Sequence, residues 1–231
     1  MTIESIRYSK IDYDKIPQYA KKLDSIFQYN TDINRTAYLN WRTGRYDSNR
    51  RQFVVMGEAF FDTAYNLIQQ CLENNSDKKA DSWIFPILFN IVHGVEVYLK
   101  AINVSLSDLL GKKREITSGK HDLKGLSLSA RSLIIEYKTA NKNENTKQLF
   151  EAIKLVCHFV ENIYEKTDDM TFARYPLDKN KFGHFYIQTL ENEIIDLDKF
   201  CDQIKYIYHM LNFIYEATER LIENAHNTEI E

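Results

Sequence analysis

The stretch PILFNIVHGVEVYLKAI, residues 86–102, decides the fold of this chain. At the roughly 100° per residue of an α-helix, its apolar side chains lie on most sides of the helix. One face carries Ile91, Val95, Tyr98 and Ile102, and Phe89, Val97 and Leu99 fill much of the remainder. A helix that is apolar nearly all round is buried, so the pattern predicts the central helix of a bundle. We expect it to be capped by Asp81 or Ser82, to hold Pro86 in or just after its first turn, and to end near Leu110.

Periodic apolar residues predict further helices on both sides of this one. We expect these helices over residues 13–29, 48–71, 121–140 and 146–166, with a long amphipathic helix over 197–225. Polar composition predicts irregular structure over residues 30–50 and 167–190. The apolar stripe of the last helix suits either core packing or a dimer interface. The predicted fold class is therefore all-α: a helical bundle with a long amphipathic C-terminal helix and an irregular arm.

The chain shows no internal repeat and no linker rich in Pro or Ser, which predicts a single domain over residues 1–231. Within it we expect an N-terminal arm and helix over residues 1–50. A bundle core over 51–190 and the long C-terminal helix over 191–231 complete the domain.

Composition narrows the classes of protein that the chain can represent. Its 231 residues are 44% hydrophobic with only 7 Gly and 3 Pro, which provides a sizeable core and argues against a turn-rich β-sandwich. A formal net charge of −3 excludes a protein that binds nucleic acid through an overall positive charge. It does not exclude binding through a local basic patch. The three cysteines, Cys71, Cys157 and Cys201, lie too far apart in sequence to indicate a disulfide framework or a zinc ribbon.

No apolar segment follows Met1, and no run reaches the roughly 18 apolar residues of a spanning helix. We therefore expect a soluble cytoplasmic protein with no signal peptide and no contact with a membrane.

Three polar residues interrupt the apolar helix. His93, Glu96 and Lys100 lie at i, i+3 and i+7, within an arc of about 60°. An unpaired buried charge costs several kcal/mol, so the three must neutralise one another or face a cleft. They form either a structural ion cluster or a site in which His93 or Glu96 has a shifted pKa. His-x-x-Glu is also a metal-ligand spacing, but a di-metal site needs a second such motif that the sequence lacks, so we expect no metal and no other cofactor.

Five of the ten arginines fall between residues 35 and 51, interleaved with aromatic residues. These residues are Arg35, Arg42, Arg45, Arg50 and Arg51, with Tyr38, Trp41 and Tyr46 between them. Arginine and aromatic side chains suit phosphate contact and base stacking on single-stranded nucleic acid. The alternative is an arm held by Arg–carboxylate pairs to the acidic residues 191–231.

A second basic patch precedes His121 and consists of Lys112, Lys113, Arg114 and Lys120. If nucleic acid binds, we expect this loop and Arg174 to contact it.

Three sequence blocks occur in an order that suggests a family. PILFNIVHGVEVYLKAI (86–102) is followed by KHDLKGL (120–126) and then by DDMTFARYPLD (168–178). The order resembles the HEPN superfamily of small bacterial helical domains, with an E-x-x-L-K-A helix, an H-D-L-x-x-L helix start and an R-Y-P segment. From the first block to the last they span residues 86–178, roughly two fifths of the chain. The family-like positions are Glu96, Lys100, His121, Asp122, Arg174, Tyr175 and Pro176.

The resemblance implies an often dimeric helical bundle from toxin–antitoxin, abortive-infection or other antiphage systems. Active members resemble metal-independent endoribonucleases in which four to six residues separate an Arg from the His that follows it. Here Arg174 is followed by a His only at His184, while Arg114 and His121 have the formal spacing. If the chain cleaves RNA, we expect Arg174 to bind the phosphate, His121 to act as acid/base and Glu96 to orient His121, with His93 beside them.

Substrate contacts are then expected from Lys100, Asp122, Tyr175, Arg114 and Lys120. The expected partners are RNA or a nucleotide, a second copy of the chain in a homodimer, and a cognate antitoxin or other partner protein.

Each of these residues also has a structural interpretation. His121 and Asp122 can have the structural role alone of starting a helix, with Asp122 as the N-cap. Arg174 can pair with Asp168, Asp169 or Glu96 to fix a loop on the bundle, and His184 is expected in solvent. The second hypothesis is therefore a non-catalytic interaction module whose polar cluster is structural.

Overall fold

The computed structural model describes residues 12–21, 23, 26–28, 30–39, 48–113, 115–116, 121–141 and 146–228. The chain divides into two compact units, residues 1–39 and 40–231. Over the described ranges the regular structure is helical, apart from one isolated bridge between Leu177 and Gly183. The predicted all-α class is confirmed.

The smaller unit contains short helices. Two 3-10 turns, η1 (Tyr13–Lys15) and η2 (Ile33–Arg35), flank helix α2 (Ile16–Ala20). The helix predicted over residues 13–29 is thus wrong in length, because α2 ends at Ala20. Its neighbours Leu23 and Ile26 are 84% and 89% exposed. A short helix is marginal in water unless its apolar face packs against something, and such packing is missing at these two residues.

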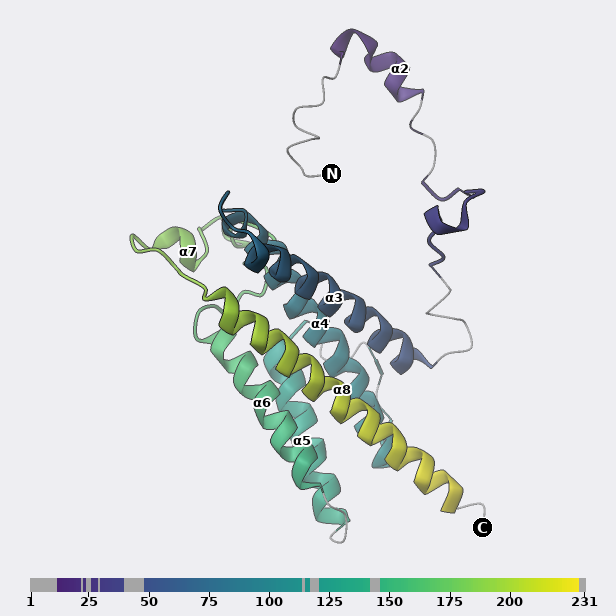
Figure 1. Ribbon diagram of the computed structural model, residues 1–231. Helices are drawn as coiled ribbons and strands as arrows, with labels where there is room; N and C mark the ends of the chain where they lie inside the picture. The colour runs from purple at the N-terminus through teal and green to yellow at the C-terminus, as the bar shows by residue number, and fades with distance from the viewer. Residues whose placement is uncertain are drawn as a thin grey trace. The chain divides into compact units, whose positions relative to one another are not determined.

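The larger unit contains six α-helices in its described residues. They are α3 (Asn49–Glu73), α4 (Ala80–Leu109), α5 (Leu123–Ala140), α6 (Lys147–Tyr164), α7 (Phe185–Gln188) and α8 (Leu197–Thr228). Helix α4 packs against α3, α5 and α8, and α6 packs against α5 and α8 (Figure 1). The predicted helices α3, α4, α5, α6 and α8 are confirmed to within a few residues, and α7 is a single turn in a region predicted to be irregular.

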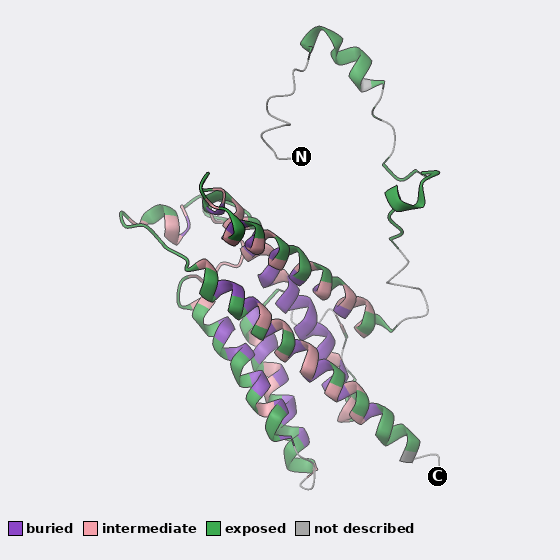
Figure 2. Cartoon of the chain, in the orientation of Figure 1, coloured by how far each residue is buried: buried purple, intermediate pink, exposed green. Residues whose placement is uncertain are grey.

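Helix α4 is the central helix of the bundle, as its sequence predicts. Residues 94–103 are buried without a break, and Figure 2 shows this part of α4 enclosed by its neighbours. By length and composition alone α4 could span a membrane, contrary to the expectation from the sequence. However, 56% of its most apolar window is buried inside the bundle, which indicates a core helix.

The start of α4 differs from the predicted one. Neither Asp81 nor Ser82 caps the helix, which begins at Ala80. The side-chain oxygen of Asn75 accepts a hydrogen bond from the Ala80 N–H at 2.9 Å, so a preceding loop residue satisfies this end of the helix. Pro86 lies in the second turn of α4, within the predicted position in or just after the first turn.

Helices α3 and α4 approach closely at Gly57. A Cβ atom built there would lie 2.6 Å from Cδ2 of the Tyr98 ring, so a larger residue would push the helices apart. The close approach brings Phe60 of α3 against His93 of α4, with ring centroids 4.6 Å apart.

The apolar stripe of α8 packs in the core. Ile204, Leu211 and Ile214 are at most 2% exposed, and α8 contacts α3, α4 and α6. Of the two roles proposed for this stripe, core packing is the one that the structure confirms.

Candidate functional site

One line of residues on α4 carries the candidate site. Phe89, His93, Glu96 and Lys100 follow one another at spacings of four, three and four, which places them on one side of a helix. The line begins among half-buried residues and ends at the buried Lys100. The polar groups are therefore set into the core helix itself rather than into a loop.

Glu96 is the centre of a four-residue cluster, which we call the Glu96 network: His93, Glu96, Lys100 and His121. Lys100 Nζ donates a hydrogen bond to Glu96 Oε1 at 2.7 Å. The same oxygen lies 3.0 Å from Nδ1 of His121, and Oε2 lies 3.6 Å from Nδ1 of His93. Lys100 thus neutralises Glu96, the first of the two arrangements that the sequence leaves open, and His121 joins them from 25 residues further along the chain.

The charge of Glu96 is fixed by its neighbours. Burial alone raises the pKa of a carboxyl group, because it disfavours the charged form. Here the hydrogen bonds with His93 and Lys100 and the attraction of Lys100 and His121 outweigh burial and lower the pKa of Glu96 to about 2. Glu96 is therefore a carboxylate throughout the physiological pH range.

His121 reaches Glu96 from the start of α5. Asp122 is the N-cap of that helix, and its Oδ1 accepts a hydrogen bond from the Gly125 N–H at 2.8 Å. The helix-start interpretation of Asp122 is therefore correct. Although His121 contacts a buried carboxylate, its own side chain is 82% exposed. With Nδ1 facing Glu96, Nε2 is the ring nitrogen left for another molecule.

Arg174 joins the other end of the line through aromatic rings. Its guanidinium lies 5.8 Å from the ring centroids of both Phe89 and Tyr175, a distance typical of cation–π contacts. Phe89 in turn stacks on His93, with centroids 5.8 Å apart and planes 8° from parallel. In the described part of the chain Arg174 forms no ion pair with Asp168, Asp169 or Glu96, so the predicted pairing that would fix its loop is wrong.

Arg174 and His121 therefore contact the same line of α4 residues, but at different positions along it. Their contacts on α4, Phe89 and Glu96, are seven residues apart, which is about 10 Å along a helix axis. Sequence reasoning identified the polar members of the line but missed Phe89 and Phe60. A signal for Phe89 was present, because it stands four residues before His93 on the same helix face.

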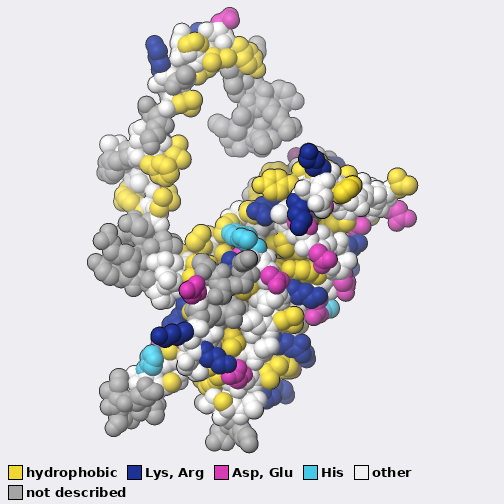
Figure 3. Space-filling view, turned by 180° about the vertical axis from the view of Figure 1, so that it is seen from behind, with side chains coloured by type: hydrophobic (Ala, Val, Ile, Leu, Met, Phe, Trp, Pro, Cys, Tyr) yellow, Lys and Arg dark blue, Asp and Glu magenta, His cyan; other side chains and the backbone are white. Residues whose placement is uncertain are grey.

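The structure describes some, but not all, of the other residues that were predicted to contact a substrate. Tyr175 is 58% exposed beside Arg174, whereas Arg114 and Lys120 lie outside the described residues. Lys112 of the same basic patch donates a hydrogen bond to Glu136 of α5 at 2.6 Å. On the face that Figure 3 shows, Lys and Arg side chains of the bundle are interspersed with Asp and Glu. Charge on that face does not form a single basic patch.

The arginine–aromatic segment is tied to the bundle at its C-terminal end. Arg42 and Arg45, like Trp41 and Tyr46, lie outside the described residues. Arg50 forms an ion pair with Asp108 of α4, and its Nε lies 3.3 Å from Glu219 Oε1 of α8. Arg50 thus pairs with an acid of residues 191–231, as the Arg–carboxylate alternative predicted, but it does so from the first turn of α3 rather than from an irregular arm.

Metal binding by His93 and Glu96 has little support from the geometry. An ammonium group already pairs with Oε1 of Glu96, so of this carboxylate only Oε2, 3.6 Å from Nδ1 of His93, is left for a metal ion. Across residues 48–113, 115–116, 121–141 and 146–228, no group of three His, Cys, Asp or Glu is arranged to hold a metal ion.

His184 was expected in solvent, and that expectation is wrong. Its side chain is 4% exposed and its ring stacks on Tyr186, with centroids 6.1 Å apart. Nε2 is buried with no hydrogen-bond partner among the described residues. Aromatic residues on both sides, Phe182 and Phe185, were the sequence signal for a buried ring.

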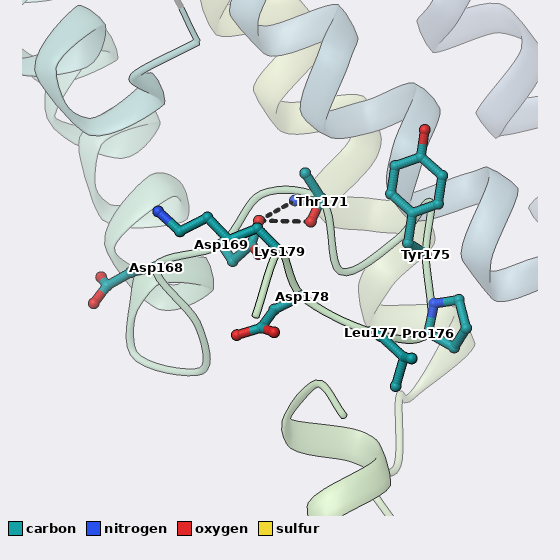
Figure 4. Close-up of a pocket in the computed structure, with 8 residues that line it drawn as sticks. All are labelled: Asp168, Asp169, Thr171, Tyr175, Pro176, Leu177, Asp178 and Lys179. Atoms are coloured by element: carbon teal, nitrogen blue, oxygen red, sulfur yellow. Dashed lines mark hydrogen bonds between the residues drawn. The ribbon is translucent and has the colours of Figure 1, made fainter. Parts of the chain in front are cut away.

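An acidic cavity of about 790 Å³ lies beside Arg174, in the loop between α6 and α7. Three carboxylates line it, those of Asp168, Asp169 and Asp178 (Figure 4). The hydroxyl and the backbone N–H of Thr171 donate hydrogen bonds to Asp169 Oδ1, at 2.6 Å and 2.9 Å. These hydrogen bonds lower the pKa of the Asp169 carboxyl. Figure 4 shows Asp168 pointing away from this pair, so the acids do not converge on one ligand position.

Comparisons with known proteins give no relative. No protein-family model, no curated protein and no solved structure matches this chain. The HEPN resemblance therefore rests on the three sequence blocks alone.

Proposed function

We propose that this chain is an HEPN-like protein of a bacterial defence or toxin-type system that binds RNA or a nucleotide at the Glu96 network and cleaves RNA without a metal ion. One observation carries the proposal: Nδ1 of the 82% exposed His121 lies 3.0 Å from the buried carboxylate of Glu96. A carboxylate that orients an accessible imidazole is the usual arrangement of a histidine that transfers protons.

The chemistry follows from the two ring nitrogens of His121. When Nδ1–H donates to Glu96, Nε2 is the basic nitrogen and can accept a proton. In RNA, Nε2 would take the proton of a 2′-hydroxyl while the 2′ oxygen attacks the adjacent phosphorus. The P–O5′ bond breaks and the imidazolium returns a proton to the 5′ oxygen, giving a 2′,3′-cyclic phosphate and a 5′-hydroxyl. Glu96 stabilises the imidazolium, and Lys100 keeps Glu96 ionised.

Arg174 supplies the positive charge that the phosphate needs. It contacts Phe89 and Tyr175 by their ring faces, which leaves its N–H groups for phosphate oxygens. Two copies facing each other, as the family resemblance implies, would bring the Arg174 of one copy toward the His121 of the other. We therefore expect a homodimer in the cytoplasm, together with a partner protein that restrains it.

The proposal is tested by incubating purified protein with mixed RNA in EDTA. Wild type should give 2′,3′-cyclic phosphate ends, while His121→Ala should lower the rate about 10²–10⁴-fold, the usual contribution of a general acid–base group. Arg174→Ala should also lose cleavage, because the phosphate charge is then unneutralised. His226→Ala is the matched control, since His226 is exposed near the end of α8 and should leave the rate unchanged.

Two results would remove the proposed mechanism. One is an absence of cleavage by wild type on every RNA tested, and the other is cleavage that is unchanged in both the His121 and Arg174 variants.

The second candidate function is a non-catalytic interaction module, and the buried pair Glu96–Lys100 favours it. Their 2.7 Å contact satisfies the carboxylate without any ligand. In this case His121→Ala and Arg174→Ala would act on stability, lowering the melting temperature by a few degrees as expected for about 1–3 kcal/mol. Unchanged melting of both variants would count against it.

A further inference from the structure

An apolar cavity of about 680 Å³ lies at one end of the bundle, away from the Glu96 network. It is open to solvent on one side and is lined by the N-terminal half of α4, the C-terminal end of α6, helix α7, and the start of α8 with the segment before it. Small-molecule sites usually measure about 300–1,000 Å³, so this cavity has the size of a ligand pocket.

Aromatic rings form much of its wall. Phe85 and Tyr186 lie with ring centroids 5.3 Å apart, and Phe172 and Phe185 lie 5.8 Å apart. These rings come from α4, from the loop between α6 and α7, and from α7 itself, so segments about 100 residues apart in sequence meet here. Offset and tilted rings of this kind favour another aromatic ring as their neighbour.

The charges at the cavity are already compensated. Lys166 Nζ donates a hydrogen bond to Glu193 Oε2 at 2.9 Å, which pairs the two charges across its rim. Asp81 lies in the first turn of α4, where the helix N-terminus stabilises a negative charge. A ligand that fits these surroundings carries no net charge.

Three of the α4 residues that line the cavity are incompletely buried, while Ile91 and Val92 of the same lining are buried. Ile84, Phe85 and Leu88 are half-buried, whereas Ile87 on the same helix is 0% exposed in the core. Apolar area that stays in contact with water costs about 25 cal/mol per Å², so an apolar molecule that covers it gains free energy.

Tyr186 connects the cavity wall to Arg174. Its hydroxyl donates to the backbone oxygen of Phe172 at 2.9 Å and lies 3.2 Å from that of Tyr175. These two carbonyl groups flank Arg174 on both sides. A molecule packed against the Tyr186 ring therefore acts on the segment that presents Arg174.

We propose that the cavity between α4, α6 and α7 binds a small, uncharged, apolar molecule with an aromatic ring, and that its binding stabilises residues 172–175. Neither statement depends on RNA cleavage, because binding and loop order are measured without RNA.

N-phenyl-1-naphthylamine, a neutral aromatic probe whose fluorescence rises in apolar surroundings, tests the binding. We expect saturable binding of one probe per chain to wild type. Leu88→Trp fills the cavity from α4 and should lower the probe affinity at least tenfold. Asn162→Trp fills it from an exposed position of α6, which keeps the test valid if Leu88→Trp fails to fold. Leu155→Trp is the matched control, because Leu155 is a 53% exposed residue of α6 outside the cavity.

Absence of saturable binding to wild type, or undiminished binding to both folded cavity-filling variants, would overturn the proposal. The effect on the loop is measured by hydrogen exchange of the Arg174 and Tyr175 amides, which both donate to the Thr171 oxygen. Bound probe should slow their exchange in wild type but not in Tyr186→Phe, which lacks the connecting hydroxyl. Equal exchange with and without bound probe in wild type would overturn the link to Arg174.

Discussion

The bundle contains two clusters of charged side chains. They consist of similar groups but differ in what they present to solvent. In the Glu96 network the buried carboxylate of Glu96 contacts the buried Lys100 and also His121, whose side chain is 82% exposed. In the second cluster Glu219 of α8 accepts a hydrogen bond from Ser105 at 2.6 Å and lies beside Arg50, whose side chain is only 17% exposed. Asp108 pairs with the same arginine. We call Arg50, Ser105, Asp108 and Glu219 the Glu219 network.

The difference lies in what each cluster presents to solvent. The Glu219 network joins α3, α4 and α8 through groups that contact one another, and it contains no histidine. The Glu96 network joins α4 to the start of α5 and keeps an exposed imidazole that can exchange a proton. A buried ion pair alone is thus consistent with a structural role, while an accessible histidine held by that pair indicates a site.

Removal of Lys100 should have the largest effect on stability. Lys100→Ala leaves the Glu96 charge buried without its ammonium partner, which costs about 3–5 kcal/mol in comparable pairs. Urea denaturation at pH 7 measures the loss. The control is Lys154→Ala, which breaks the exposed pair Lys154–Glu151 and should change the free energy of unfolding by less than about 0.5 kcal/mol. Equal losses for the two variants would contradict the buried pairing.

The second-largest expected effect is the contribution of Glu96 to the pH dependence of the free energy of unfolding. Its folded pKa of about 2 lies below the ordinary value of 4.5, so its contribution is complete above about pH 5 and is lost as pH falls toward 2. Between pH 7 and pH 3 wild type should lose about 2 kcal/mol more than Glu96→Gln, which has no proton to gain. Urea denaturation of both proteins at the two pH values measures this difference. Identical losses would show that Glu96 is not an ionised, stabilised carboxylate.

The Glu219 network should respond less to a comparable change. Glu219→Ala removes one partner of Arg50 and of Ser105 but leaves the pair Arg50–Asp108, so we expect a loss of about 1 kcal/mol. RNA cleavage should be unchanged, because no member of the Glu219 network contacts His121. Thermal or urea unfolding and the cleavage assay in EDTA check the two halves of this prediction. A loss of cleavage without a loss of stability would reverse the roles that we assign to the two networks.

Much of the bundle could be predicted from the sequence because local pattern determines it. The apolar side chains on most sides of residues 86–102 predicted a buried helix, and the regular spacing from Leu197 onward predicted a long amphipathic one. His93, Glu96 and Lys100 were expected to lie together because helix geometry alone places them on one side.

What the sequence could not show depends on long-range packing. The hydrogen bond to the first N–H of α4 comes from Asn75, and the length of α2 depends on the absence of packing at Leu23 and Ile26. The burial of His184 and the cation–π contacts of Arg174 arise in the loop between α6 and α7, whose conformation follows no local periodicity. The contact of His121 with Glu96 was predicted only through the resemblance of the sequence blocks.

The central claim is that Glu96 fixes His121 so that Nε2 is the base. The tautomer of the neutral His121 ring tests it most directly, through a long-range ¹H–¹⁵N correlation spectrum of ¹⁵N-labelled protein, with His121→Ala assigning the signals. We predict that the proton resides on Nδ1 in wild type and that Glu96→Gln weakens this preference, since the tautomer follows the hydrogen bond that the ring makes. A ring protonated at Nε2 in wild type, unaffected by Glu96→Gln, would contradict the account.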